Sequence, residues 1–349
     1  MRAAALLLTL ALWPVTTLAQ DWATPAFCDA PPRAITEDDF APHDLSALEA
    51  SASEIPNGVG RLWEVTAPNG AISHLWGTFH VSVPQILDLP EEVKGQISDA
   101  RVVALEIDFT FPDRESFLMQ YDLPGRYRDP GDPFLPQDTL DLSFLGRDAE
   151  GWVYDRMYSF GIGEDALYVL TYAGLAELLL SDPCEDLNAG TIPVQDDLIH
   201  TLGHITGAEV LGLETPGEFL TDLADDDATA KAITMVYASY LQPTDDPAAR
   251  VAGFQLYLEG RLGMLAAWDA AHLAHTFGDE GAKALALTDA YLLDARNERF
   301  LERVGPELET GGVFLAVGAA HLPGQNGLVA MLRDRGYDVT RIALPGEVE

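Results

Sequence analysis

The chain has 349 residues, of which 20 are basic and 56 acidic, and its formal net charge is −36; 48% of its residues are apolar. A chain of this length and apolar content can bury a large core, so a wholly disordered protein is excluded. A surface this acidic repels phosphate backbones and anionic headgroups, which argues against nucleic acid and membrane surfaces as partners.

Residues 1–19 have the pattern of a secretory signal peptide. Arg2 supplies a short positive region, an apolar stretch runs from Ala3 to Trp13, and small residues precede a cleavage position after Ala19. This stretch is shorter than the about 20 apolar residues that a membrane-spanning helix needs. We therefore expect export to the periplasm or the extracellular space, with no membrane insertion after cleavage.

Cys28 and Cys184 are the only cysteines, and both remain after cleavage. An exported chain meets an oxidising compartment, where cysteines pair. We expect a disulfide between them; the alternative is two unrelated buried thiols.

After an irregular segment at residues 20–60, apolar runs and turn signals predict an alternation of strands and helices. The predicted elements in chain order are a short helix near Asp44–Glu54, strands Arg61–Val65 and Ile72–Phe79, a helix ending near Asp99, strand Val102–Ile107, helices Ala166–Leu180 and Val194–Ile205, strand Glu209–Leu213, helices over most of Glu218–Arg303, strand Val313–Val317, helix Asn326–Arg335 and strand Tyr337–Ala343. The first two strands flank the turn signal Pro68-Asn69-Gly70 and form a predicted hairpin. Strand–helix–strand units at both ends indicate an α/β fold with a central mixed, largely parallel sheet flanked by helices.

In open α/β sheets, functional residues lie beyond the carboxyl ends of the strands. The motif Gly-x-x-His follows two predicted strands, as Gly77 to His80 and as Gly318 to His321. The carboxylates Glu106 and Glu214 end two others. We expect these side chains to converge on one edge of the sheet, with the strand of Glu106 beside the strand of His80.

Imidazole and carboxylate together are ligands for Mn, Co, Zn or Fe, and a carboxylate can also act as a general base. A glycine before each histidine permits a sharp turn or close packing. The sequence thus predicts that His80, His321 and Glu106 bind a divalent metal, and that Glu106 and Glu214 are the catalytic carboxylates. For any single histidine of this kind, a structural role is the competing interpretation.

The segments carrying these residues, together with the helix around Arg296-Asn297 and the long motif from Val313 to Val339, resemble the TraB/GumN family (TraB/PrgY/GumN), which is related to the Tiki metalloproteases. The resemblance covers about residues 61–343. It implies a single α/β domain over 61–349 with helical insertions at about 111–185 and 216–305. It also implies, as in the Tiki branch, a metal-dependent peptidase with two Gly-x-x-His motifs and a glutamate.

Arg296, with Asn297 in the same helix motif, can clamp a substrate carboxylate or hold Glu106 or Glu214, because guanidinium matches carboxylate geometry. The competing interpretation is a surface ion pair with Glu298 or Glu302.

Other patterns are weaker. His200 and His204 have the i, i+4 spacing of metal ligands, but no zinc-protease glutamate accompanies them, and we judge metal binding there to be the minority interpretation. His272 and His275 are interpreted as surface or core residues, and Asp225 to Asp227 as a solvated loop. A Gly-x-Ser-x-Gly elbow and a phosphate-binding loop are both missing from the sequence.

Two functions remain open from the sequence. The first is an exported metal-dependent hydrolase, a peptidase acting on a peptide or an envelope component. The second is a non-catalytic binding or regulatory protein of the same fold.

Overall fold

The computed structural model of the protein describes residues 28, 30–108, 110, 125–128, 139–159, 162–182, 184, 194–241 and 247–349. The predicted signal peptide lies outside the described residues. No helix in the described part of the chain combines the length and apolar character that a bilayer crossing requires.

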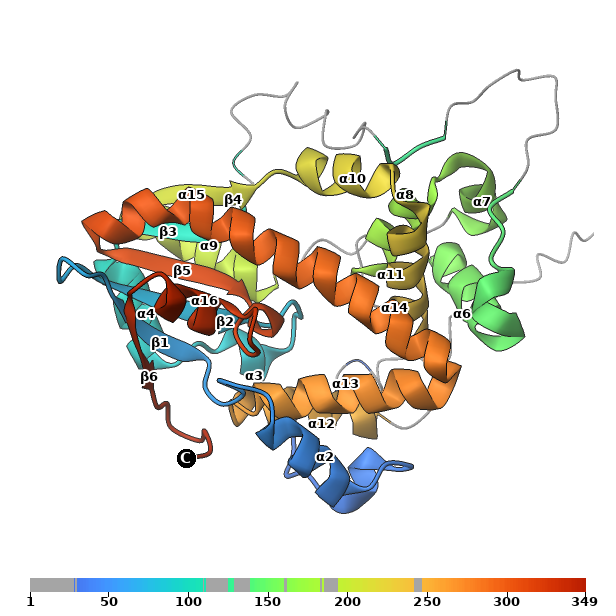
Figure 1. Ribbon diagram of the computed structural model, residues 1–349, viewed down its shortest axis with the longest axis horizontal. Coiled ribbons are helices and arrows are strands. Elements are labelled where there is room, and N and C mark those ends of the chain that lie inside the picture. Colours follow the sequence, from blue (N-terminus) through green and yellow to red (C-terminus); the bar gives the residue numbers. More distant parts are fainter. Residues whose placement is uncertain are drawn as a thin grey trace, which may run out of the picture.

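A six-stranded sheet organises the fold (Figure 1). Its strands are β1 (Leu62–Thr66), β2 (Ile72–Thr78), β3 (Val102–Ile107), β4 (Glu209–Glu214), β5 (Val313–Gly318) and β6 (Asp338–Ile342), in the spatial order β4-β3-β5-β2-β1-β6. Four neighbouring strands, β4, β3, β5 and β2, run parallel, and β1 is antiparallel to both of its neighbours. The predicted α/β fold with a mixed, largely parallel sheet is confirmed.

The predicted neighbour of β3 is wrong. β5 lies between β2 and β3, so the strand of Glu106 adjoins the strand that leads to His321 rather than the one that leads to His80. The apolar pattern of a strand shows that it is buried on both faces, but it does not show which strand lies beside it.

The helices lie on both sides of the sheet and in a separate group at its carboxyl edge. They are α2 (Leu45–Ser53), α3 (Pro84–Leu87), α4 (Glu91–Asp99), α6 (Gly146–Ser159), α7 (Ala166–Val169), α8 (Tyr172–Leu179), α9 (Gln195–Thr206), α10 (Pro216–Ala224), α11 (Asp227–Ser239), α12 (Ala248–Leu258), α13 (Leu262–Phe277), α14 (Asp279–Asp289), α15 (Arg296–Thr310) and α16 (Leu328–Asp334). Figure 1 shows α15 and α16 in front of the sheet and α4 and α9 behind it.

Helix α9 packs closely on the sheet because of a glycine. A Cβ atom at Gly203 would lie 3.1 Å from the Cβ of Val103 in β3, so a larger residue would push the helix away. The helix ends at Gly207, whose φ of 85° is the left-handed conformation that glycine adopts readily. Because α9 packs this closely on the sheet, its two ends have fixed positions with respect to the ends of β2 and β3.

The helical insertions have an apolar core of their own, formed mainly by α6, α8, α11, α13 and α14. Two predictions about their helices are wrong in detail. The predicted helix Ala166–Leu180 is divided into α7 and α8, because Thr171 caps the second helix by accepting a hydrogen bond from the Gly174 N–H at 2.9 Å. The helix predicted to end at Arg303 runs on to Thr310.

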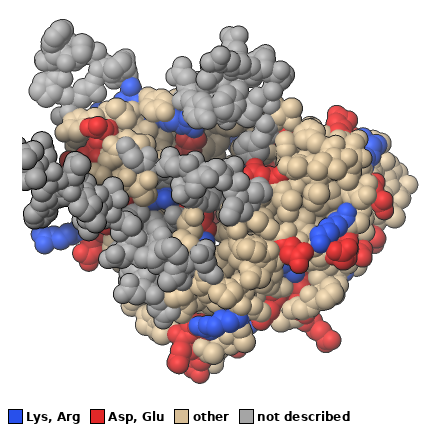
Figure 2. All heavy atoms as spheres, turned by 180° about the vertical axis from the view of Figure 1, so that it is seen from behind, with Lys and Arg blue, Asp and Glu red and all other residues tan. Residues whose placement is uncertain are grey.

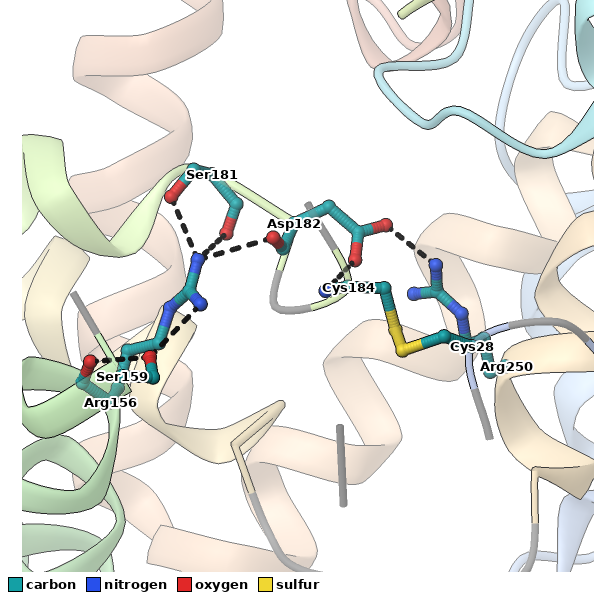
Figure 3. Close-up of a disulfide and its surroundings, with 7 residues drawn as sticks. All are labelled: Cys28, Arg156, Ser159, Ser181, Asp182, Cys184 and Arg250. Carbon is teal, nitrogen blue, oxygen red and sulfur yellow. Dashed lines mark hydrogen bonds and ion pairs between the residues drawn. A yellow bond between two sulfur atoms is a disulfide. The ribbon is translucent and has the colours of Figure 1, made fainter. Parts of the chain in front are cut away.

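Cys28 and Cys184 form a disulfide (Figure 3). They are 156 residues apart, so the bridge closes a long loop and contributes about 4–5 kcal/mol in the chain-entropy model. Beside it, Asp182 accepts a hydrogen bond from the Cys184 N–H at 2.7 Å and from Arg250 at 2.8 Å. The bridge therefore ties the N-terminal segment to the end of the first helical insertion.

Candidate functional site

The predicted site residues come together at the carboxyl edge of the parallel strands. His80 lies two residues after β2, Glu106 is in β3, and Glu214 is the last residue of β4. His321 follows β5 in a short 3-10 turn, Ala319–His321. Arg296 and Asn297 begin α15, directly after a π-helical segment, Ala290–Ala295.

Glu106 is the centre of this cluster. Its Oε1 atom lies 3.6 Å from His321 Nε2 and 3.8 Å from His80 Nε2, and it accepts a hydrogen bond from the Gly318 N–H at 2.7 Å. Its other oxygen, Oε2, accepts from Arg296 Nη2 at 2.5 Å. One carboxylate oxygen thus faces both imidazoles, while the other is held by a guanidinium.

Asn297 fixes the orientation of the His321 ring. The Asn297 amide nitrogen donates to the carbonyl of Asn326 at 2.9 Å and to that of His321 at 3.4 Å. The amide oxygen is therefore turned to His321 Nδ1, at 2.7 Å, and accepts its proton. With Nδ1 protonated, the neutral ring keeps its lone pair on Nε2, the atom that faces Glu106.

Asp196 plays the corresponding part for His80. Its Oδ2 atom lies 2.7 Å from His80 Nδ1, and its Oδ1 atom accepts from the Thr78 hydroxyl at 2.9 Å. Asp196 is in the first turn of α9, a position that is 116 residues from His80 in the sequence. Sequence reasoning missed this residue; the only signal was an acidic pair, Asp196-Asp197, at the start of a predicted helix.

Gln195 supports the segment that carries His80, and it too was missed. Its side-chain oxygen accepts from the Phe79 N–H at 3.2 Å, from Trp76 Nε1 at 3.2 Å and from the Tyr257 hydroxyl at 2.9 Å. Its amide nitrogen donates to the carbonyl of Ile86 at 2.6 Å. These buried bonds fix the backbone just before His80.

Arg296 bridges the two glutamates and is not a surface ion-pair partner of Glu298 or Glu302. Its Nε atom donates to Glu214 Oε1 at 2.8 Å, and Nη2 contacts both Glu214 and Glu106. The Glu214 side chain is 1% exposed, and its Oε2 has no hydrogen-bond partner among the described residues. Burial raises the pKa of the Glu214 carboxyl, against the opposing effect of Arg296. Glu214 is thus placed to hold Arg296, beyond contact with the imidazoles.

Glu106, His321 and His80 influence one another's pKa. Burial disfavours the ionised form of Glu106, but Arg296 and the two imidazoles outweigh it and hold the pKa of the carboxyl well below its usual range. Burial lowers the pKa of His321 to about 3, so this ring is neutral at pH 7. Burial also opposes the charged form of His80, but Asp196 and Glu106 outweigh it and raise its pKa to about 9. Because the His80 side chain is 53% exposed, solvent moderates these effects there.

The two motif glycines make room for the cluster. A Cβ atom at Gly318 would lie 2.9 Å from His80 Nε2 and 3.2 Å from Glu106 Oε1. A Cβ atom at Gly77 would lie 3.1 Å from the Cα of Ala319, at the turn that leads to His321. The glycines are therefore needed for close approach of side chains and backbone.

We expect Gly318→Ala to displace His80 from Glu106 and to weaken divalent-metal affinity by about tenfold or more, because the added methyl group would lie too close to both side chains. Isothermal titration calorimetry with Mn²⁺ measures this change. Gly253→Ala in α12 is the matched control, since a Cβ atom there meets nothing within 4 Å. Equal metal affinity in Gly318→Ala and in the parent would contradict the placement.

Tyr237, in α11 of the helical insertion, lies close to this cluster. Burial raises the pKa of Tyr237 to about 12, and the charges of Arg296 and Glu106 are close enough to influence it. Near it lies Asp269, whose carboxyl has its pKa raised to about 7 by burial. Burial likewise raises the pKa of Asp289 to about 6.

A carboxyl with a raised pKa in the folded state binds its proton more tightly there than in the unfolded chain. Its contribution to stability is present at low pH and is lost as the pH rises from about 4 to about 7. We therefore expect Asp269→Asn to increase the free energy of unfolding at pH 8 by roughly 1–3 kcal/mol and to change it little at pH 4. Urea unfolding at both pH values measures this, and a variant less stable than the parent at pH 8 would contradict it.

Acidic side chains are spread over the face shown in Figure 2, and basic side chains stand singly among them.

The predicted solvated loop Asp225 to Asp227 has a structural role. Asp226 caps α11 by accepting hydrogen bonds from the backbone N–H groups of Ala228 and Thr229, both at 3.1 Å.

The fold and the cluster define an α/β protein with two imidazoles and a carboxylate at the carboxyl edge of its parallel strands. The chain belongs to the TraB/PrgY/gumN family, whose family model matches residues 61–341. The resemblance seen in the sequence is thereby confirmed. No curated protein and no solved structure matches the chain.

Proposed function

We propose that this protein is an exported metal-dependent hydrolase that acts on peptides. The observation that carries the proposal is the orientation of the two imidazoles. Each has its Nδ1 held by a side-chain oxygen, from Asp196 or Asn297, and each turns its Nε2 to the same oxygen of Glu106. Histidines that bind metals are held in this way, because the bond at one ring nitrogen directs the other to the metal.

The donor set fits a divalent cation. Nitrogen and oxygen ligands bind Zn²⁺ at about 2.0–2.2 Å, which places two donors of a tetrahedral site roughly 3.4 Å apart. The distances from Glu106 Oε1 to the two Nε2 atoms, 3.6 and 3.8 Å, are close to this value. The three donor atoms do not all lie within 4.8 Å of one another, so one imidazole must move inward, and the half-exposed His80 can do so without disturbing the core.

His321 Nε2 presents a lone pair, and the ionised Glu106 a negative charge, to the same point, which a cation there stabilises. The pKa of His80 is raised to about 9, so a bound cation would displace the proton that His80 carries at pH 7. Mn, Co, Zn and Fe are all compatible with imidazole and carboxylate ligands. A bound cation would supply Lewis acidity and lower the pKa of a coordinated water. Glu106 would hold the cation through Oε1, while Glu214 would keep Arg296, and through it Glu106, in place.

The proposal of export and the proposal of a peptide substrate rest on different observations. Residues 1–19 have the signal-peptide pattern, and the disulfide is of a kind that persists in oxidising compartments. The peptide substrate follows from the resemblance to the Tiki metalloproteases. A peptide or an envelope component is the proposed partner.

The experiment uses the chain from residue 20, purified without a polyhistidine tag. Metal content is measured, and hydrolysis of a peptide library is followed with Mn²⁺, Co²⁺, Zn²⁺ or Fe²⁺, before and after chelation. We expect metal-dependent hydrolysis that is lost in His80→Ala and His321→Ala and kept in His275→Ala, an exposed histidine of α13. Bound metal without hydrolysis of any peptide would favour the non-catalytic binding protein, and a parent without metal affinity would contradict the proposal.

A further inference from the structure

We propose a second divalent-cation site, formed by Asp108, His200 and His204, between α9 and the residues that follow β3. Among the described residues, these are the three potential metal ligands whose donor atoms all lie within 4.8 Å of one another. His200 Nε2 is 2.9 Å from Asp108 Oδ1, and the two imidazole centroids are 4.7 Å apart. None of the three belongs to the cluster around Glu106.

The backbone brings these ligands together. His200 and His204 are one turn apart on α9, so their rings lie on the same side of the helix. Asp108 directly follows β3, and the close contact of Gly203 with Val103 holds α9 against that strand. The site therefore joins α9 to the residues that directly follow the strand on which α9 packs.

A fourth donor, the Thr110 hydroxyl, completes the set. Its oxygen is 3.0 Å from His204 Nε2 and 3.4 Å from His200 Nε2, and its backbone N–H donates to Asp108 Oδ1 at 2.8 Å. Two imidazoles, one carboxylate and one hydroxyl or water are the ligands of four-coordinate Zn²⁺ or Co²⁺. The net charge of −36 also raises the local concentration of cations.

A cation bound here would stabilise the cluster around Glu106 by holding the elements that support it. The first turn of α9 carries Asp196, which holds His80, and Asp108 is two residues after Glu106. Linking the second turn of α9 to the end of β3 would thus fix the distance between the supports of His80 and Glu106. The role that follows is structural: the cation adds stability and takes no part in bond breaking.

The test is a Zn²⁺ and Co²⁺ titration of the untagged chain from residue 20, with stoichiometry from calorimetry and the metal-induced rise in melting temperature. His204 is exposed, so His204→Ala removes a ligand without removing core contacts. We expect it to lower the affinity of one equivalent at least tenfold and to reduce the rise in melting temperature. His275→Ala, the matched control, should retain the stoichiometry of the parent.

The two sites can be told apart in the same titration. His321→Ala should leave the equivalent at Asp108, His200 and His204 intact, whether or not the cluster around Glu106 binds metal. If His204→Ala has the stoichiometry, affinities and melting-temperature rise of the parent, the three side chains form only a hydrogen-bonded network, and the proposal is overturned.

Discussion

Glu106→Gln is expected to reduce peptide hydrolysis by about a hundredfold or more, because it removes the anionic ligand that holds the proposed catalytic metal. Glutamine keeps the shape of the side chain and can still accept the Gly318 N–H and the Arg296 guanidinium. It lacks the negative charge that the proposed metal site requires. Turnover at saturating metal, together with metal affinity, measures the effect.

The matched control for this variant is Glu302→Gln, an exposed glutamate of α15. It should have the activity and metal affinity of the parent. Equal turnover in Glu106→Gln and in the parent would contradict the role of Glu106, because the amide of the variant cannot bind a divalent cation strongly.

Arg296→Met is expected to destabilise the fold by about 3–5 kcal/mol, the range found when one member of a buried ion pair is removed. The substitution would leave the carboxylates of Glu106 and Glu214 close together without the guanidinium group that now bonds both of them. Glu214→Gln should cost less stability than Arg296→Met, since Arg296 retains its bond to Glu106. It should also cost less activity than Glu106→Gln, because Glu214 does not face the imidazoles. Urea unfolding at pH 7 measures the stabilities.

Arg299→Met provides the control on the same helix. Arg299 pairs with the largely exposed Asp222 at 3.3 Å, a surface interaction worth about 1 kcal/mol or less. If Arg296→Met lowered the free energy of unfolding no more than Arg299→Met, the bridging role of Arg296 would be wrong.

The edge of the sheet where the cluster forms could be predicted because local patterns decide where strands end. Parallel strands bring their carboxyl ends to one edge, so His80, Glu106, Glu214 and His321 were placed together without knowledge of the strand order. That order could not be predicted, because strand pairing depends on contacts between distant segments. Glu106 reaches both imidazoles even though β5 separates β3 from β2.

The supporting residues were less accessible to sequence reasoning. Gln195 and Asp196 look like ordinary residues of a helix start, and their role follows only from the packing of α9 behind β2 and β3. Helix boundaries in the second insertion have clear local signals. Asp226 is a helix cap, and Gly260, with φ of 68°, lies between α12 and α13.

The most direct measurement of the central proposal is anomalous diffraction from a crystal of the chain from residue 20 grown with Mn²⁺ or Co²⁺. We expect a peak within about 2.0–2.3 Å of Glu106 Oε1 and of the Nε2 atoms of His80 and His321. A crystal with no anomalous peak at these three side chains, whether or not metal is bound at Asp108, His200 and His204, would contradict it.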